Sequence, residues 1–452
     1  MHVNRFLPAD RVVTAAIALA LAAVLGCAPA APRPEALLRD PAPATARQTS
    51  FRGWRGCIEL SNRLVSVTCV PVVGGRTLRF ALGSDNPLLI GKDECGQTLA
   101  TTDGRPLPTI GGHSVRLHPE ARWQELQSRA PAALTTAPYE AKILGEGAVS
   151  AVELTSPVDL ASGTQLVRRV ELFAGTTHVR ITDKLTTVRL VPQEWGIHDV
   201  LQLKGHPRPS GVLRSDDTAT GGLRLYVPLN PESQFRGGYE RILPTTRRGI
   251  GGAPQWSSDA LPGLLVLAYR REFSKIAVDP RLPWIAFSDP TRQYVFVQRC
   301  RVPRKEIVTA GGPIRSYPFI EVQSFAPAVR LGRGESTELV QDWYAARCPG
   351  PVVDVTDAGV VSAPLSLLRG SEGDTWAAGT FGAFVVGTAA IVFRDGKGKE
   401  LGRLDCGVVS PFEPIVLHRR VELPPTTSQV ALEVSGAEGK PVGHLGKILL
   451  GP

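Results

Sequence analysis

The chain has 452 residues, of which 51 are Lys or Arg and 42 are Asp or Glu, and its formal net charge is +9. The basic residues are scattered, which argues against nucleic acid as a partner and favours a solvated surface or one that faces an anionic glycan. Forty-six glycines, 38 prolines and a single methionine disfavour long helices, because Gly and Pro interrupt nearly every apolar run. The composition therefore predicts an all-β protein.

Residues 1–27 have the organisation of a lipoprotein signal peptide. Arg5 and Arg11 precede an apolar run over residues 12–25, which is too short to remain as a membrane-spanning helix. The run ends in VLGC, which resembles a bacterial lipobox and makes Cys27 the predicted site of lipidation. An ordinary secretory signal, cut nearby, is the alternative. The lipobox predicts a lipid-anchored protein of the cell envelope that faces the periplasm or the cell surface.

Residues 28–50 are rich in Ala, Pro and Arg without apolar periodicity, and they are predicted to be a flexible linker. Short β-type runs then follow one another at close spacing up to residue 350, and only Glu120 to Gln127 has a helical pattern. Antiparallel strands in this number must stack as sandwiched sheets to bury their apolar faces. We therefore expect residues 51–350 to form one large β domain.

A cluster of turn residues from Arg347 to Pro351 closes this block, and a new series of β-type runs begins after it. About 100 residues of such runs suit a small β-sandwich, which we place at residues 351–452. The alternative is that these runs add strands to the main body.

Six cysteines remain besides Cys27, an even number in a compartment that permits disulfides. Cys57 and Cys69 stand symmetrically about Asn62-Arg63, so a hairpin that turns there predicts a disulfide between them. The other four can pair in three ways or stay as free thiols; they are Cys95, Cys300, Cys348 and Cys406.

Several catalytic motifs are absent from the sequence. It contains no HExxH, CxxC, GxxxxGK or GxSxG, which removes most of the support for zinc peptidases, NTPases and serine esterases. His113 and His118 are five residues apart and would lie on opposite faces of a strand, so a metal site on that pair is not expected. We predict neither a metal nor a cofactor.

Strand alternation points to a different kind of site. In the strand predicted over residues 196–203, Ile197, Leu201 and Leu203 share the core face, and His198 and Gln202 share the other. Aromatic, amide and carboxylate side chains share the second face of two further strands: Tyr317, Phe319, Glu321 and Gln323; and Tyr294, Phe296 and Gln298. Aromatic rings beside fixed hydrogen-bonding groups suit a sugar, and an ordinary solvated sheet face is the alternative.

Four segments resemble galactose-mutarotase-like domains. LSNRLVSVTCVPVVGGRTLRFAL resembles their opening hairpin, and TQLVRRVELFAGTTHVRITDKLTTV their paired central strands. HDVLQL resembles the strand that bears the histidine, and FIEVQSFAPAVRLGRGES the strand that bears the glutamate. The likeness covers roughly Phe51 to Cys348 and is nearest to an uncharacterised bacterial secreted family. It implies a β-supersandwich of the galactose-mutarotase type that deals with carbohydrate.

The resemblance also implies roles for individual residues. His198 matches the family's acid and Glu321 its base, and opening a pyranose ring needs a carboxylate for the anomeric hydroxyl and an imidazole for the ring oxygen. His113 and Arg76 are loose matches to other sugar-binding positions. The remaining substrate-binding candidates come from the strands described above: Gln202, Tyr294, Phe296, Phe319 and Gln323.

Three functions remain open on this basis. One is an enzyme of the aldose-epimerase type, and another is a non-catalytic glycan-binding or envelope-associated protein that uses the same groove. A third is glycoside hydrolysis or lyase chemistry, and hydrolysis requires two facing carboxylates. Glu321 would supply one, with Glu194 or Asp216 as weaker candidates for the other.

Overall fold

The structure is a computed structural model, and its described residues are 34–91, 94–98, 110–126, 132–205, 222–243, 256–269, 274–300, 305–310 and 319–451. The predicted signal peptide with Cys27, and the residues Asp216 and Tyr317, lie outside these ranges. Within them, no helix has the length and apolar character needed to cross a membrane.

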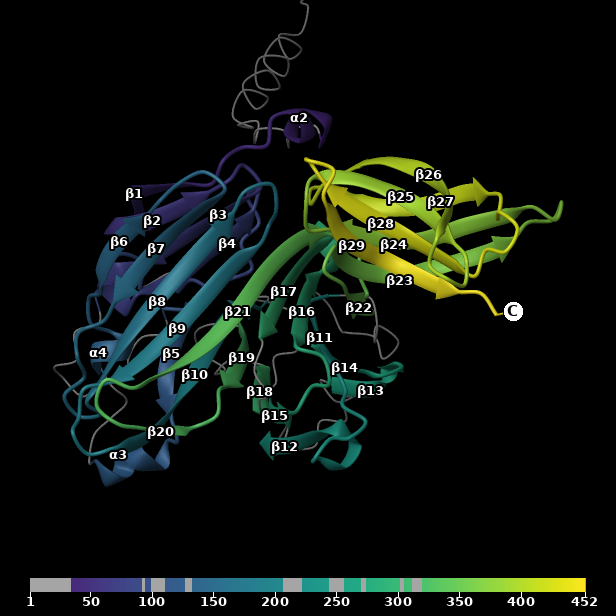
Figure 1. Ribbon diagram of the computed structural model, residues 1–452. Coiled ribbons are helices and arrows are strands. Elements are labelled where there is room, and N and C mark those ends of the chain that lie inside the picture. The colour runs from purple at the N-terminus through teal and green to yellow at the C-terminus, as the bar shows by residue number, and fades with distance from the viewer. Residues whose placement is uncertain are drawn as a thin grey trace, which may run out of the picture. The chain divides into compact units, whose positions relative to one another are not determined.

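The main body is built on two large antiparallel sheets (Figure 1). The first has eleven strands, with β20 paired to β10 beside the main order. In spatial order its strands are β1 (Thr45–Phe51), β2 (Trp54–Ser61), β3 (Val65–Val70), β4 (Arg76–Leu82), β5 (Gly112–His118), β10 (Gln193–Lys204), β19 (Phe319–Phe325), β18 (Lys305–Ala310), β15 (Ser274–Val278) and β12 (Tyr239–Leu243), with β20 (Val329–Leu331) on β10.

The second sheet has ten strands. Their spatial order is β13 (Trp256–Leu261), β14 (Leu264–Ala268), β11 (Arg224–Pro228), β16 (Trp284–Asp289), β17 (Tyr294–Cys300), β21 (Ser336–Arg347), β9 (Val179–Thr187), β8 (Thr164–Phe173), β7 (Val149–Thr155) and β6 (Glu140–Leu144). Among the described residues, helices are few and short: α2 (Pro34–Arg39), α3 (Ala121–Glu125), α4 (Ala132–Thr135), and the 3₁₀ turns η1 (Pro71–Val73), η2 (Arg236–Gly238) and η3 (Pro290–Arg292).

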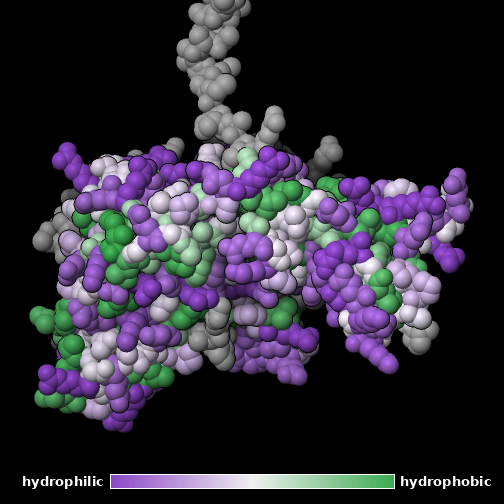
Figure 2. Space-filling view, turned by 45° about the horizontal axis from the view of Figure 1, so that its top comes forward, coloured by the Kyte–Doolittle hydropathy of each residue, from purple (hydrophilic) through white to green (hydrophobic). Residues whose placement is uncertain are grey.

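One hydrophobic core joins the two sheets. Strand β8 alternates buried and less buried residues along its whole length, as expected when one face of a strand is covered. Its inward residues Leu166 and Val170 belong to the same buried cluster as Val115 and Leu201 of the first sheet. The prediction of an all-β sandwich is thus confirmed. Figure 2 shows that hydrophilic side chains cover most of the face in view, with hydrophobic ones in smaller patches.

Residues 34–50 differ from the flexible linker that was predicted. Residues 34–39 form α2, and Thr45–Phe51 pairs as the edge strand β1 with β2. The helix is held because Leu37 is buried in a cluster with Leu64 and Val386. Polar, Thr-rich sequence suits an edge strand that has one face in solvent, and the low apolar content of β1 concealed this role.

The predicted disulfide between Cys57 and Cys69 is wrong. Cys69 pairs with Ile58 across the β2–β3 hairpin, one residue away from the expected register. A shift of one residue moves a side chain to the other face of a strand. Cys57 accordingly belongs to a small cluster with Trp54, whereas Cys69 belongs to the main core. All six cysteines of the described residues are free.

The C-terminal part contains two four-stranded sheets with a hydrophobic cluster of their own. One sheet is β22 (Asp354–Val355), β23 (Gly359–Arg369), β24 (Thr375–Ala383) and β27 (Pro414–Val421), and the other is β26 (Glu400–Val409), β25 (Gly387–Arg394), β28 (Gln429–Gly436) and β29 (Pro441–Leu449). The predicted boundary at residue 350 falls in the loop between β21 and β22. Independent folding of the two parts stays a prediction.

Candidate functional site

Strand β10 is a central strand between β5 and β19, and most residues on both of its faces are buried. Its odd-numbered residues face the core, where Ile197 and Leu201 join the main cluster. Its even-numbered residues, among them His198 and Gln202, face the other way, as the alternation predicted. The core face of β10 carries the carboxylate of Asp199, and the opposite face carries the imidazole of His198.

On the core side, Asp199 lies at the centre of a group of polar side chains that we call the interior cluster: His113, Arg168, Asp183, Asp199, Gln298 and Gln341. His113 Nε2 hydrogen-bonds Asp199 Oδ1. Gln341 Nε2 donates to the same oxygen at 2.9 Å, and Gln298 Nε2 donates to Oδ2 at 3.1 Å. Burial raises the pKa of Asp199, but His113, Gln341 and Arg168 outweigh it, and the pKa lies below its usual value.

Arg168 and Asp183 complete the interior cluster from the second sheet. Arg168 Nε donates to Asp183 Oδ1 at 2.7 Å, and its Nη1 donates to the backbone carbonyl of Gly75 at 3.1 Å. Arg168 is 1% exposed and Asp183 is fully buried. Neighbouring carboxylates raise the pKa of Arg168 although burial alone lowers it, so the guanidinium stays charged.

Three side chains of the interior cluster could ligate a metal ion by distance alone. Ligand atoms of His113, Asp183 and Asp199 lie within 4.8 Å of one another. However, Asp183 already has Arg168 as its counterion, and Asp199 has the imidazole and two amides. A dication beside a buried guanidinium would add repulsion in a region of low dielectric constant. We therefore assign the interior cluster to the stability of the fold.

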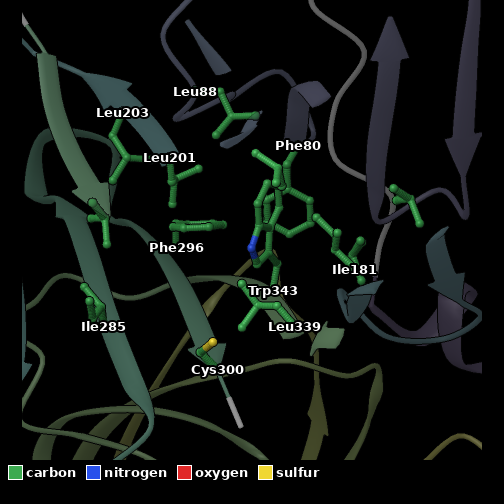
Figure 3. Close-up of a cluster of buried hydrophobic side chains, with 14 of the residues drawn as sticks. Phe80, Leu88, Ile181, Leu201, Leu203, Ile285, Phe296, Cys300, Leu339 and Trp343 are labelled. Atoms are coloured by element: carbon green, nitrogen blue, oxygen red, sulfur yellow. The ribbon is translucent and has the colours of Figure 1, made fainter. Parts of the chain in front are cut away.

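This placement corrects several predicted sugar-binding residues. His113 is fully buried and bonded to Asp199, so it cannot reach a ligand. Phe296 packs edge-on against Phe80 and Trp343 in the core (Figure 3). The ring of Tyr294 is also part of that core, although its hydroxyl oxygen is left without a hydrogen-bond partner. The interpretation failed because β17 is buried on both faces: Val295 and Val297 pack in a further cluster that includes Val352 and Phe384.

Arg76, another predicted sugar-binding residue, binds the protein backbone. Its Nη1 donates to the backbone carbonyl of Gly111 at 3.1 Å, at the turn that leads into β5. Burial, together with Arg116 and Arg168, lowers the pKa of Arg76 to about 10. Gly111 has φ +91° there, and a Cβ on it would approach the carbonyl oxygen of Leu89 to 2.3 Å. The guanidinium therefore holds a turn that only glycine can form.

On the other side of β10, an amide, a carboxylate and a second amide form a row. Gln202 Nε2 donates to Glu321 Oε2 at 2.7 Å, and Gln323 Nε2 donates to Glu321 Oε1. Gln202 and Glu321 are directly paired residues of β10 and β19, and Phe319 is paired with Lys204. Glu321 is 8% exposed and Gln202 is half-buried. We call Gln202, Glu321 and Gln323 the polar row.

His198 lies on the same face as the polar row, but not beside it. Its ring stacks on Phe325 with centroids 4.2 Å apart, and its Nε2 is buried with no hydrogen-bond partner. Burial, together with Arg116, lowers the pKa of His198 to about 3, so the imidazole is neutral near pH 7. A neutral imidazole that is fixed by stacking is a poor proton donor.

The register separates His198 from Glu321. His198 is opposite Phe325, whereas Glu321 is opposite Gln202, four residues further along β10. At about 3.3 Å per residue this is about 13 Å. The anomeric hydroxyl and the ring oxygen of a pyranose are bonded to one carbon, so one sugar cannot meet both side chains in those roles. The residue that does face Glu321 is an amide, which binds hydroxyl groups but transfers no proton.

Glu194, a candidate second carboxylate for hydrolysis, lies opposite Arg330 of β20. It precedes Gln202 by eight residues on β10, or about 26 Å. The two carboxyl groups of glycosidases lie no more than about 9.5 Å apart. The structure therefore does not bring Glu194 to Glu321.

Some polar contacts were not predicted from sequence. Gln298 and Gln341 bind the two oxygens of Asp199, and Gln298 Nε2 also donates to Gln341 Oε1 at 2.7 Å. Gln341 lies between the buried Leu339 and Trp343 on the inward face of β21. The sequence signal that could have revealed this contact is Gln341 itself, a polar residue at a position where the alternation of β21 predicts an apolar one.

No protein-family model matches the chain, and no curated protein matches it. Solved structures similar to it include a candidate aldose 1-epimerase from Klebsiella pneumoniae, at 10% identity and a TM-score of 0.48, with 70% of this chain and 87% of that chain covered. A galactose mutarotase-like protein from Clostridium acetobutylicum has 12% identity and a TM-score of 0.45, covering 67% of this chain and 99% of that one.

A TPR-domain containing protein from Parabacteroides distasonis is also similar, with 12% identity and a TM-score of 0.45. The likeness covers 70% of this chain but spans only half of that protein. Galactose-mutarotase-like proteins, which the sequence resembles, are thus among the solved structures similar to the chain. At these identities and with TM-scores below 0.5, nothing about its chemistry follows from them.

Proposed function

We propose that the chain binds carbohydrate at the polar row and does not interconvert anomers there. The observation that supports binding is the geometry of Glu321 between Gln202 and Gln323. Two amide donors fix a carboxylate that has lone pairs left for further hydrogen bonds, and each amide keeps a free acceptor or donor. Such a row can bind neighbouring hydroxyl groups of one sugar ring.

Phe319 and Phe325 flank the polar row on the same face of β19. Aromatic rings beside fixed polar groups are typical of saccharide sites, because the ring covers the apolar face of the sugar. The distance of about 13 Å between the His198 and Glu321 positions argues against the epimerase mechanism, which needs an acid and a base at one anomeric centre.

Glu321→Gln tests this proposal, because it keeps the shape of the side chain and removes its charge. We expect glycan affinity to fall about tenfold or more, since hydrogen bonds to charged groups contribute about 1.5–3 kcal/mol. The matched control is Glu338→Gln, at an exposed position of β21. Binding is measured by calorimetry with a panel of oligosaccharides, and mutarotation by polarimetry. Acceleration by the wild type that Glu321→Gln abolishes would show that the site is catalytic.

We further propose that the chain is exported and held in the cell envelope through a lipid on Cys27. The support is the VLGC sequence after the apolar run. Metabolic labelling with palmitate should mark the wild type and not Cys27→Ser. Label that persists in Cys27→Ser would contradict the anchor assignment without affecting the proposal for the polar row.

A further inference from the structure

A pocket of about 350 Å³ lies at the end of β10, and its volume is within the usual range of small-ligand sites. We call it the Lys204 pocket. Lys204 follows Gln202 by two residues on the same face of β10, which places it about 7 Å from the polar row. It is also lined by Asp85, Asp289, Arg292 and Tyr294.

The carboxylates of this pocket are already neutralised by arginines. Arg347 Nη2 contacts Asp85 Oδ2 at 2.6 Å, and Arg292 Nε lies 3.3 Å from Asp85 Oδ1. Arg292 Nη1 also donates to Asp289 Oδ2 at 2.7 Å. The backbone N–H of Lys204 donates to the carbonyl of Pro87 at 2.8 Å, but its ammonium group has neither a hydrogen bond nor an ion pair among the described residues. Lys204, Arg292 and Arg347 stand against the two carboxylates of Asp85 and Asp289, and Arg52 adds to the positive potential at Lys204, so this group has an excess of positive charge.

Tyr294 supplies a second unpartnered group. It lines the pocket, is 2% exposed, and its hydroxyl oxygen is buried without a hydrogen-bond partner. A buried hydroxyl with no partner costs about 1–3 kcal/mol, which a ligand oxygen would offset. Burial lowers the pKa of Lys204, Arg292 and Arg52 lower it further, and Asp85 and Asp289 offset this only in part.

We infer that the Lys204 pocket binds the carboxylate of a uronic acid residue, so that the carbohydrate of this protein is an acidic glycan. This inference rests on the proposed function, because a sugar at the polar row would place its neighbour near Lys204. A carboxylate would give the Lys204 ammonium group the ion pair that it lacks among the described residues. A phosphate dianion fits less well. Arg292 and Arg347 are already paired with Asp85 and Asp289, and these two carboxylates would repel a phosphate.

Calorimetry on the purified full chain tests this with trigalacturonate, trimannuronate and the methyl esters of both. The ester keeps the sugar and removes the charge. We expect the wild type to bind at least one acid about 10- to 100-fold more tightly than its ester, as one charge-assisted hydrogen bond would give. Lys204→Met should abolish that preference and leave ester binding unchanged. Lys184→Met, which removes an exposed lysine of β9, is the matched control and should keep it.

The other outcomes separate the two proposals. If acids and esters bind the wild type equally, and Glu321→Gln weakens both, the polar row binds neutral sugar and the inference on Lys204 is wrong. A preference for the acid that persists in Lys204→Met also overturns it. Acetate that displaces the trisaccharide at millimolar concentration would show a general carboxylate site and overturn the uronate assignment. If no saccharide binds, both proposals fail.

Discussion

The two faces of the sheet around β10 each carry a histidine and a carboxylate, but the hydrogen bonding of these groups differs between the faces. On the core face, the carboxylate of Asp199 receives hydrogen bonds from His113, Gln298 and Gln341 and is fully buried. On the other face, Glu321 receives two amide hydrogen bonds and remains partly exposed, while His198 has a buried nitrogen with no partner. A histidine and a carboxylate therefore do not identify a site by themselves. What distinguishes the two carboxylates is their exposure: Asp199 is fully buried, whereas Glu321 is 8% exposed.

The largest loss of stability should appear when the interior cluster loses the guanidinium of Arg168. Arg168→Met leaves Asp183 buried without a counterion, and breaking a buried ion pair in this way costs about 3–5 kcal/mol. Denaturant unfolding measures the loss. The control is Arg403→Met, whose partner Glu400 is exposed, with an expected loss of about 0–1 kcal/mol. Equal losses in the two variants would mean that the interior cluster has no special role in stability.

A smaller effect, with a defined pH dependence, is expected at Asp199. Its pKa is lowered in the folded state, so the stabilisation it gives is present above its unfolded pKa of about 3.9 and is lost as pH falls through the folded value. Asp199→Asn should cost about 1–3 kcal/mol at pH 7. Melting curves at pH 7, 5, 4 and 3 should show this difference shrinking only below about pH 4. A constant difference over the whole range would contradict the assignment.

On the opposite face, a substitution should lower glycan affinity strongly and stability only slightly. Glu321→Gln removes the charge and one of the two acceptor oxygens, so one hydrogen bond becomes neutral and the other is kept only if its glutamine partner turns its amide oxygen inward. The substitution should cost about 1 kcal/mol of stability. Glycan affinity should nevertheless fall as described above, whereas Asp199→Asn should leave it unchanged at pH 7. Unfolding and binding measured on the same preparations test this. If glycan affinity falls in both variants in proportion to their loss of stability, the two faces do not differ in function.

The smallest effect is expected at His198. His198→Phe keeps the stacking on Phe325 and removes a buried nitrogen without a partner, so stability at pH 7 should stay within about 0.5 kcal/mol of the wild type. The lowered pKa means that the folded protein binds no proton there while the unfolded chain does, so the wild type should lose stability below about pH 6.5 relative to this variant.

An NMR titration gives an independent measurement of His198. Its imidazole signals should not shift between pH 8 and pH 4, because burial and Arg116 lower its pKa to about 3. A midpoint near 6.5 would contradict the buried, neutral state and would restore the histidine as a candidate acid.

The sequence predicts the faces of β10 but not the partners of its residues. Alternation assigns His198 and Gln202 to one face and Leu201 to the other, because every second residue of a strand shares a face. Register is set by pairing between strands far apart in the chain, so the four-residue offset between His198 and Glu321 has no local signal. Phe296 was misplaced for a related reason: a strand covered on both faces loses the alternation that would show which side is open.

The one-residue offset in the β2–β3 hairpin bears on how the protein is made. Because Cys57 and Cys69 face opposite sides of the sheet, and the six cysteines of the described residues are free thiols, the described fold needs no oxidation step to form. A reducing compartment and an oxidising one should therefore yield the same native state. Its biogenesis would then be independent of the cell's thiol oxidases, and a reductant added to the purified protein should leave its melting temperature unchanged.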